Sequence, residues 1–127
     1  MATKYLFLNS RDEFYRIEVG KIVYFEANGN YTNFRVGAKL KGIALTSLTK
    51  LQGVLSESLR EDARMFARIG KRFIVNLNYV YQIDIAKQKL TLSDQDTFYV
   101  QLPISKDALR KLRDMYIGIK GIKESGE

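Results

Sequence analysis

The chain has 127 residues, 46% of them apolar, and a formal net charge of +7 at pH 7. This length indicates one domain with one core, and the lack of any apolar run near about 18 residues excludes a membrane-spanning helix. Histidine and cysteine are absent, which excludes disulfides, thiol nucleophiles and the usual imidazole base. We therefore expect no enzyme, metal, cofactor, small-molecule substrate or membrane contact, and, without a signal peptide, a cytoplasmic location.

The positive charge is confined to the middle of the chain. Residues 1–30 and 91–127 are each balanced, whereas residues 31–90 hold eleven basic and four acidic side chains. A charge concentrated inside a fold predicts a basic face, which attracts nucleic acid by long-range steering. A solvated face that serves only solubility is the alternative.

The first third of the chain reads as strands joined by short turns, because branched and aromatic residues alternate with polar ones. Asn28 and Gly29 predict a tight hairpin turn, since both tolerate positive φ. The expected strands are 5–8, 14–19, 22–27, 31–36 and 40–45. The aromatic side chains expected in the core are Phe14, Tyr24, Phe25 and Phe34.

Leucines at helical spacing predict a helix over residues 46–59, capped by Thr46 or Ser47. A second helix is expected from Ser105, and residues 118–127 are expected to fray. The inner leucines of the first helix are Leu48, Leu51, Leu55 and Leu59, and the inner stripe of the second is Leu109, Leu112 and Tyr116. The remaining strands are expected at 66–69, 73–75, 79–85, 89–92 and 98–102. The predicted fold is mainly β and antiparallel, with two marginal helices.

A basic corner, Gly70-Lys71-Arg72, separates two of these strands. Gly70 permits a tight turn, and the sheet would then hold Lys71 and Arg72 out into solvent. Such an arrangement presents charge to a polyanion. A solvated hairpin tip without a partner is the simpler interpretation.

Three motifs resemble those of LytTR DNA-binding domains. Residues 22–31, Ile-Val-Tyr-Phe-Glu-Ala-Asn-Gly-Asn-Tyr, resemble the opening motif; residues 68–77, Arg-Ile-Gly-Lys-Arg-Phe-Ile-Val-Asn-Leu, the second; and residues 103–106, Pro-Ile-Ser-Lys, the third. They occur in the family's order, and the resemblance covers residues 15–117. It implies one LytTR-like domain over residues 1–117 with an antiparallel, β-sandwich-like fold.

The resemblance also implies a function. Members regulate transcription by binding double-stranded DNA at promoter repeats, with loops in major grooves, and can pair on DNA. Carried over by position, the first motif points to Asn30, Tyr31 and Asn33, the second to Lys71 and Arg72, and the third to Lys106. Further phosphate contacts are expected from Lys39, Lys41, Arg64 and Arg68.

The chain departs from the family pattern in two places. Gly70-Lys71-Arg72 stands where many members have His-Arg-Ser or His-Asn-Ser, and Lys106 stands where Arg is more usual. Arginine grips guanine with two parallel hydrogen bonds, whereas lysine offers a mobile point charge. The base preferences of relatives therefore do not transfer to this chain.

Structural roles are open for several of these residues. Tyr31 could pack on the sheet, Asn30 could serve its turn, and Arg68 could flank the core or pair with an acid. Asn76 is expected to bond the backbone of the turn that follows it.

Two other functions are also open. One is a non-enzymatic protein-interaction module whose basic face meets an acidic partner or whose sheet edge accepts a strand. The other is a single-stranded nucleic-acid binder, which requires exposed aromatic side chains in a basic groove. A stand-alone regulator is favoured over a domain of a longer protein, because the first strand runs directly into the domain.

Overall fold

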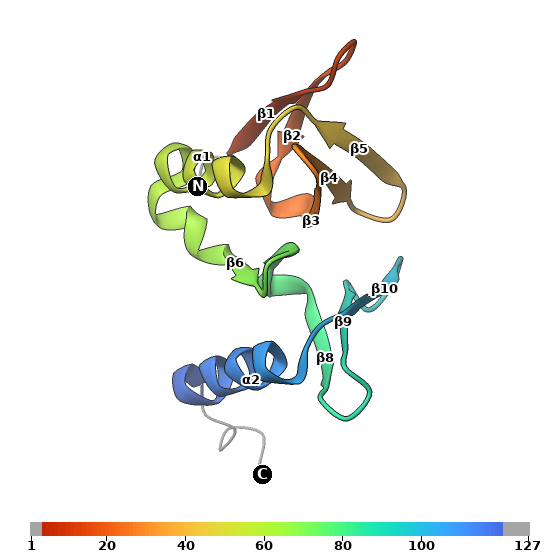
Figure 1. Ribbon diagram of the computed structural model, residues 1–127, viewed down its shortest axis with the longest axis vertical. Helices are drawn as coiled ribbons and strands as arrows, with labels where there is room; N and C mark the ends of the chain where they lie inside the picture. The colour runs from red at the N-terminus through yellow and green to blue at the C-terminus, as the bar shows by residue number, and fades with distance from the viewer. Residues whose placement is uncertain (1–3, 121–127) are drawn as a thin grey trace.

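Three antiparallel sheets and two helices make up the fold (Figure 1). The computed structural model describes residues 4–120. The sheets have the orders β1-β2, β5-β4-β3-β7-β6 and β10-β9-β8. The elements are β1 (Tyr5–Asn9), β2 (Phe14–Glu18), β3 (Ile22–Asn28), β4 (Tyr31–Val36), β5 (Leu40–Ala44), α1 (Leu48–Leu59), β6 (Phe66–Ile69), β7 (Phe73–Asn76), β8 (Val80–Asp84), β9 (Lys89–Ser93), β10 (Tyr99–Pro103) and α2 (Lys106–Lys120), with short 3-10 segments η1 (Val19–Lys21), η2 (Arg60–Met65) and η3 (Leu77–Tyr79).

The five-stranded sheet separates two hydrophobic cores, where one had been expected. Phe25 of β3 and Ile74 of β7 belong to the core that the sheet forms with α1 and the β1–β2 hairpin. Val23 and Val75, from the same two strands, belong to the core formed with β8, β9, β10 and α2. Successive side chains of a strand point to opposite faces, so β3 and β7 contribute to both cores. In Figure 1 these layers lie one above the other, with β6 between them.

Helix α1 confirms the leucine pattern, since all four predicted leucines are buried. It begins at Leu48, two residues later than predicted. The Ser47 hydroxyl caps it by accepting a hydrogen bond from the Lys50 N–H at 3.2 Å. The Thr46 carbonyl instead accepts the hydroxyl of Thr32 in β4 at 2.7 Å, which ties the start of the helix to the sheet.

Helix α2 is capped by Ser105, whose hydroxyl accepts the Ala108 N–H at 3.3 Å. The Tyr116 hydroxyl donates to the Leu77 carbonyl at 2.5 Å and holds the helix against η3. The helix extends to Lys120, so residues 118–120 are helical where fraying was expected, and residues 121–127 lie outside the described residues. Within residues 4–120, no helix is both long and apolar enough to cross a membrane.

The fully buried Asn76 reinforces the pairing of β3 with β7. Its side-chain Nδ2 donates to the Ile22 carbonyl at 2.8 Å, and its Oδ1 accepts the Asn78 N–H at 2.9 Å. The second bond is the turn contact expected from the sequence. The first is longer in range and compensates the cost of burying the amide.

One aromatic prediction was wrong. Phe14 is 69% exposed and stacks on Phe7, itself 57% exposed, with ring centroids 5.8 Å apart. The β1–β2 hairpin buries only one face, through Leu6, Leu8 and Ile17. Phe14 lies on the other face of this two-stranded sheet.

Asp94 makes the stability of the fold sensitive to acid. Hydrogen bonds from the Thr97 hydroxyl first, and from backbone N–H groups of the turn, lower the pKa of Asp94 from 3.8 to about 2. Because the folded-state pKa lies below the unfolded one, this stabilisation is present above pH 3.8 and is lost as the pH falls toward about 2. Thermal melting between pH 5 and pH 2 should show this loss in the parent protein and less of it in Asp94→Asn. Asp96→Asn, in the same turn, is the matched control, and parallel loss in all three proteins would contradict the assignment.

Candidate nucleic-acid interface

The β3–β4 turn lies at one end of the central sheet. Asn28 pairs opposite Tyr31, so the turn consists of Gly29 and Asn30 and falls one residue later than predicted. Gly29 has a φ of +62°, a conformation that favours glycine. Asn30 and Tyr31 are exposed beside it. The turn therefore presents an amide and a phenol to solvent.

The β6–β7 loop lies beside this turn. Ile69 pairs with Phe73, which leaves a three-residue loop of Gly70, Lys71 and Arg72. Gly70 has a φ of +64°, as the tight corner requires. The Ala27 N–H donates to the Arg72 carbonyl at 2.8 Å, so the loop is bonded to β3 next to its turn. Both basic side chains of the loop are exposed.

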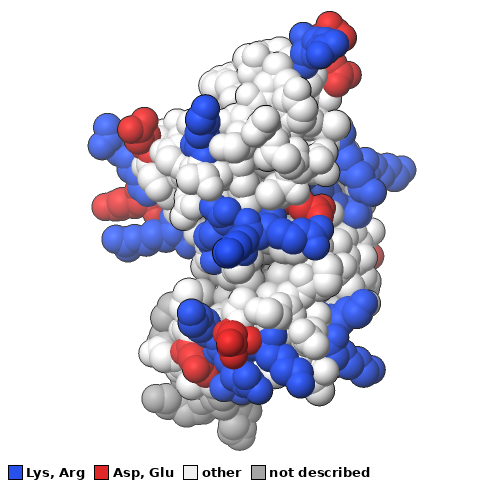
Figure 2. Space-filling view, in the orientation of Figure 1, with Lys and Arg blue, Asp and Glu red and all other residues white. Residues whose placement is uncertain are grey.

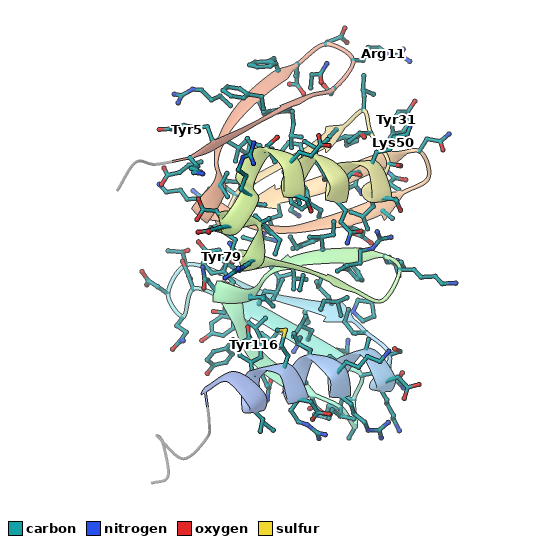
Figure 3. All side chains as sticks on the ribbon, turned by 90° about the vertical axis from the view of Figure 1, so that its left-hand side faces the viewer. Tyr5, Arg11, Tyr31, Lys50, Tyr79 and Tyr116 are labelled. Atoms are coloured by element: carbon teal, nitrogen blue, oxygen red, sulfur yellow. The ribbon has the colours of Figure 1, made fainter. Side chains whose placement is uncertain are left out.

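The two helices begin near the same end. A groove between β6 and α2 is lined by Arg68 and Gly70 on one side and by Ser105 on the other, which places the start of α2, and exposed Lys106 with it, near the β6–β7 loop. In Figure 3, Tyr31 and Lys50 of α1 lie at one edge of the molecule, and Tyr79 lies at the opposite edge.

Basic side chains gather on this part of the surface. Figure 2 shows a band of Lys and Arg across the middle of the face in view, at the level of β6 in Figure 1. Acidic side chains are fewer in the band than basic ones. The basic middle of the sequence therefore does form a basic surface.

Arg68 connects the loop to α1. Its guanidinium donates to the Lys71 carbonyl at 2.7 Å, to the Gln52 side chain at 2.9 Å and to the Thr49 hydroxyl at 3.4 Å. Its Nε atom is buried without a partner among the described residues. These contacts give Arg68 a supporting role, one of the alternatives that the sequence left open.

Polar groups form a row on the open face next to the loop. Arg72 makes an ion pair with Glu26, and its guanidinium carbon lies 5.1 Å from the centroid of the Phe73 ring. The Asn28 side chain donates to Asn33 Oδ1 at 3.1 Å. Burial, with a smaller contribution from Glu26, raises the pKa of the nearby Tyr24 above 10.0, so its phenol is neutral at physiological pH.

Lys39 and Lys41 lie apart from this row. Lys39 is in the loop between β4 and β5, at the end of the sheet opposite the β3–β4 turn. Lys41 stands opposite Arg35 on the edge strand β5. Arg35 itself donates to the Gly37 and Ala38 carbonyls at 3.1 and 2.8 Å, which fixes that loop. The structure thus brings together six of the nine predicted residues, Asn30, Tyr31, Asn33, Arg68, Lys71 and Arg72, with Lys106 nearby.

Sequence reasoning missed three charged residues at this interface. Glu26 pairs with Arg72, and Lys50 lies in the first turn of α1. Lys87 is exposed in the β8–β9 loop, which is bonded to the start of α2 by Ile104 N–H and the Gln88 carbonyl at 3.1 Å. An acid within a strand was the available signal for Glu26, and the N-cap at Ser47 was the signal for Lys50.

The interface can bind anions and hydrogen-bond to base edges. Lysine and arginine neutralise phosphates, while guanidinium and amide groups can also recognise bases. Within residues 4–120, no group of three or more Asp or Glu side chains is arranged to hold a metal ion. A basic surface on a sheet, with amides and arginine at turn ends, is the arrangement of a nucleic-acid-binding domain that uses loops.

Comparisons with known proteins give the family. The model of the LytTr DNA-binding domain matches residues 12–117, and the chain belongs to this family. A solved LytTr DNA-binding domain, assigned to a methyl-accepting/DNA response regulator from Bacillus cereus, has a similar fold, with a TM-score of 0.63 and 22% sequence identity over 91% of this chain and 98% of that one. No curated protein matches the chain in sequence. The resemblance inferred from three motifs and the mainly β antiparallel fold are both confirmed.

The contacts of Arg68 lead to a test of its role in DNA binding. As a support for the loop, Arg68 needs its forked donors, so Arg68→Lys should weaken duplex binding nearly as much as Arg68→Ala. The salt dependence should stay unchanged, because no phosphate contact is lost at this position. Fluorescence anisotropy with a labelled duplex at several salt concentrations measures both quantities.

A direct phosphate contact by Arg68 gives the opposite pattern. Arg68→Lys would then keep most of the affinity, and Arg68→Ala would reduce the salt slope by about one. Lys39→Ala, which removes a positive charge at the far end of the sheet, is the control for net charge.

Proposed function

We propose that this protein is a sequence-specific transcriptional regulator that binds double-stranded DNA and contacts major grooves through its loops. The observation that carries the proposal is the convergence of the β3–β4 turn and the β6–β7 loop, side by side, with the start of α2 close by. Each presents an exposed polar or basic side chain: Asn30, Arg72 and Lys106. Together they offer both phosphate-binding and base-reading groups.

The helices support loop readout. Helix α1 packs its leucine stripe on the sheet, and α2 packs Leu109 and Leu112 into the second core. The β3–β4 and β6–β7 connections protrude from the sheet as short turns. A major groove about 12 Å wide admits such turns as readily as a helix.

The proposed activity is binding at promoter repeats, where two copies can pair on the DNA, and it requires no catalysis or cofactor. The family assignment supports DNA as the partner. The basic surface supports electrostatic attraction to the duplex. Action on DNA places the protein in the cytoplasm.

The rival functions fit other surfaces less well. A single-strand binder needs exposed aromatic side chains within the basic groove. Tyr31, 45% exposed, meets this requirement, but Phe7 and Phe14 lie on the β1–β2 hairpin instead. That stacked aromatic pair favours the hairpin as a contact surface for protein, an activity compatible with DNA binding elsewhere on the molecule.

Replacing Arg72 tests sequence-specific recognition. A duplex selected from a randomised pool by the parent protein serves as the specific target, and a scrambled duplex as the reference. Arg72→Ala should lose about 1–3 kcal/mol of binding free energy and relax the preference at one base position. If ~5 phosphates are neutralised, log K for the parent should fall with log salt at a slope of roughly −4 to −5.

Arg64→Ala is the matched control, because Arg64 is exposed in η2, at the start of β6 and away from the loop. Equal affinity of the parent protein for specific and scrambled duplexes, even at raised salt, would refute sequence-specific binding. Tighter binding of single strands would instead support the single-strand function.

A further inference from the structure

The loop arginine is held from three directions. Its carbonyl accepts the Ala27 N–H at 2.8 Å, which fixes its backbone on β3. Its Nη2 donates to Glu26 Oε2. Its guanidinium carbon lies 5.1 Å from the ring centroid of Phe73. The side chain of Arg72 is nevertheless 60% exposed, whereas that of Glu26 is 26% exposed.

This geometry leaves part of the guanidinium free for a ligand. Among the described residues, Nε and Nη1 of Arg72 have no hydrogen-bond partner, and Nη2 retains a second hydrogen. Guanine presents two acceptors in the major groove, O6 and N7, which match two parallel donors of an arginine. A guanidinium already oriented by a carboxylate and a ring face loses less side-chain freedom on binding such a pair of acceptors.

Fold stability does not account for the ion pair. Exposed ion pairs contribute little to folding, because solvent screens them and two side chains must be ordered. Moreover, Glu26 is an acid placed within a basic surface, where it weakens attraction to phosphate. Its placement is understandable if it orients the arginine beside it.

We propose that Glu26 is a positioning residue that orients Arg72 for one guanine and so sets the base preference of this loop. The proposal rests on the proposed function, because it requires that Arg72 contacts bases. Glu26 acts through Arg72: its carboxylate holds Nη2, and the remaining donors of the guanidinium face the groove. The ion pair is therefore retained in the DNA complex.

The test compares Glu26→Gln and Glu26→Ala with the parent protein on the selected duplex, on duplexes with single base changes, and on a scrambled duplex. Both variants should bind the scrambled duplex at least as tightly as the parent, because a negative charge is lost. Their discrimination at the base read by Arg72 should fall about tenfold, within the range of one bidentate contact. Glu26→Asp should restore discrimination in part.

A double-variant cycle assigns the effect to the pair. In an Arg72→Ala background, Glu26→Ala should leave the base preference unchanged. Glu18→Gln is the matched control, since Glu18 pairs with Lys21 at 3.9 Å, close to the other end of β3. Thermal melting of each variant checks that the fold is kept.

The outcomes separate this proposal from the proposed function. If Arg72→Ala relaxes the preference but the Glu26 variants keep it, or change affinity equally for all duplexes, then Glu26 is not a positioning residue. If the parent protein does not discriminate among duplexes at all, the proposed function itself fails. An effect of Glu26→Ala that persists in the Arg72→Ala background would also overturn the proposal.

Discussion

The antiparallel pairing of β3 with β7 is the contact on which the rest of the structure depends. It joins Tyr24 to Val75 and Phe25 to Ile74, residues far apart in the sequence, and so completes the five-stranded sheet. Closing so long a loop costs chain entropy, which the buried side chains of two cores and the amide of Asn76 offset. Without this pairing, α1 and α2 would have no common sheet to cover.

The same pairing determines where the DNA-binding surface forms. The far end of β3 carries the turn of Gly29 and Asn30, and the near end of β7 follows the loop that ends at Arg72. Register alone therefore brings the two turns together. Their short length and their backbone bonds to the sheet fix the side chains before any ligand arrives, which reduces the ordering cost of binding.

Local patterns predicted the elements well and long-range contacts poorly. The leucines of α1 and the alternation in the strands depend on nearest neighbours along the chain, so the sequence shows them directly. Phe14 was misplaced because alternation does not tell which face of an isolated hairpin meets the core. Charge alone likewise assigned Arg68 to phosphate, whereas its guanidinium lies between the Lys71 carbonyl and side chains of α1. Lys39 and the partnership of Glu26 with Arg72 depend on register, which no single segment reveals.

The construction of the β6–β7 loop has an evolutionary consequence. Gly70 is constrained by its positive φ, but Lys71 and Arg72 project from the sheet and are absent from both cores. Such positions can be exchanged without repacking the interior, so a lineage built on this sheet can diversify its targets through a few exposed residues. Positions 26 and 72 face each other across two strands, and drift at one is expected to be accompanied by covariation at the other.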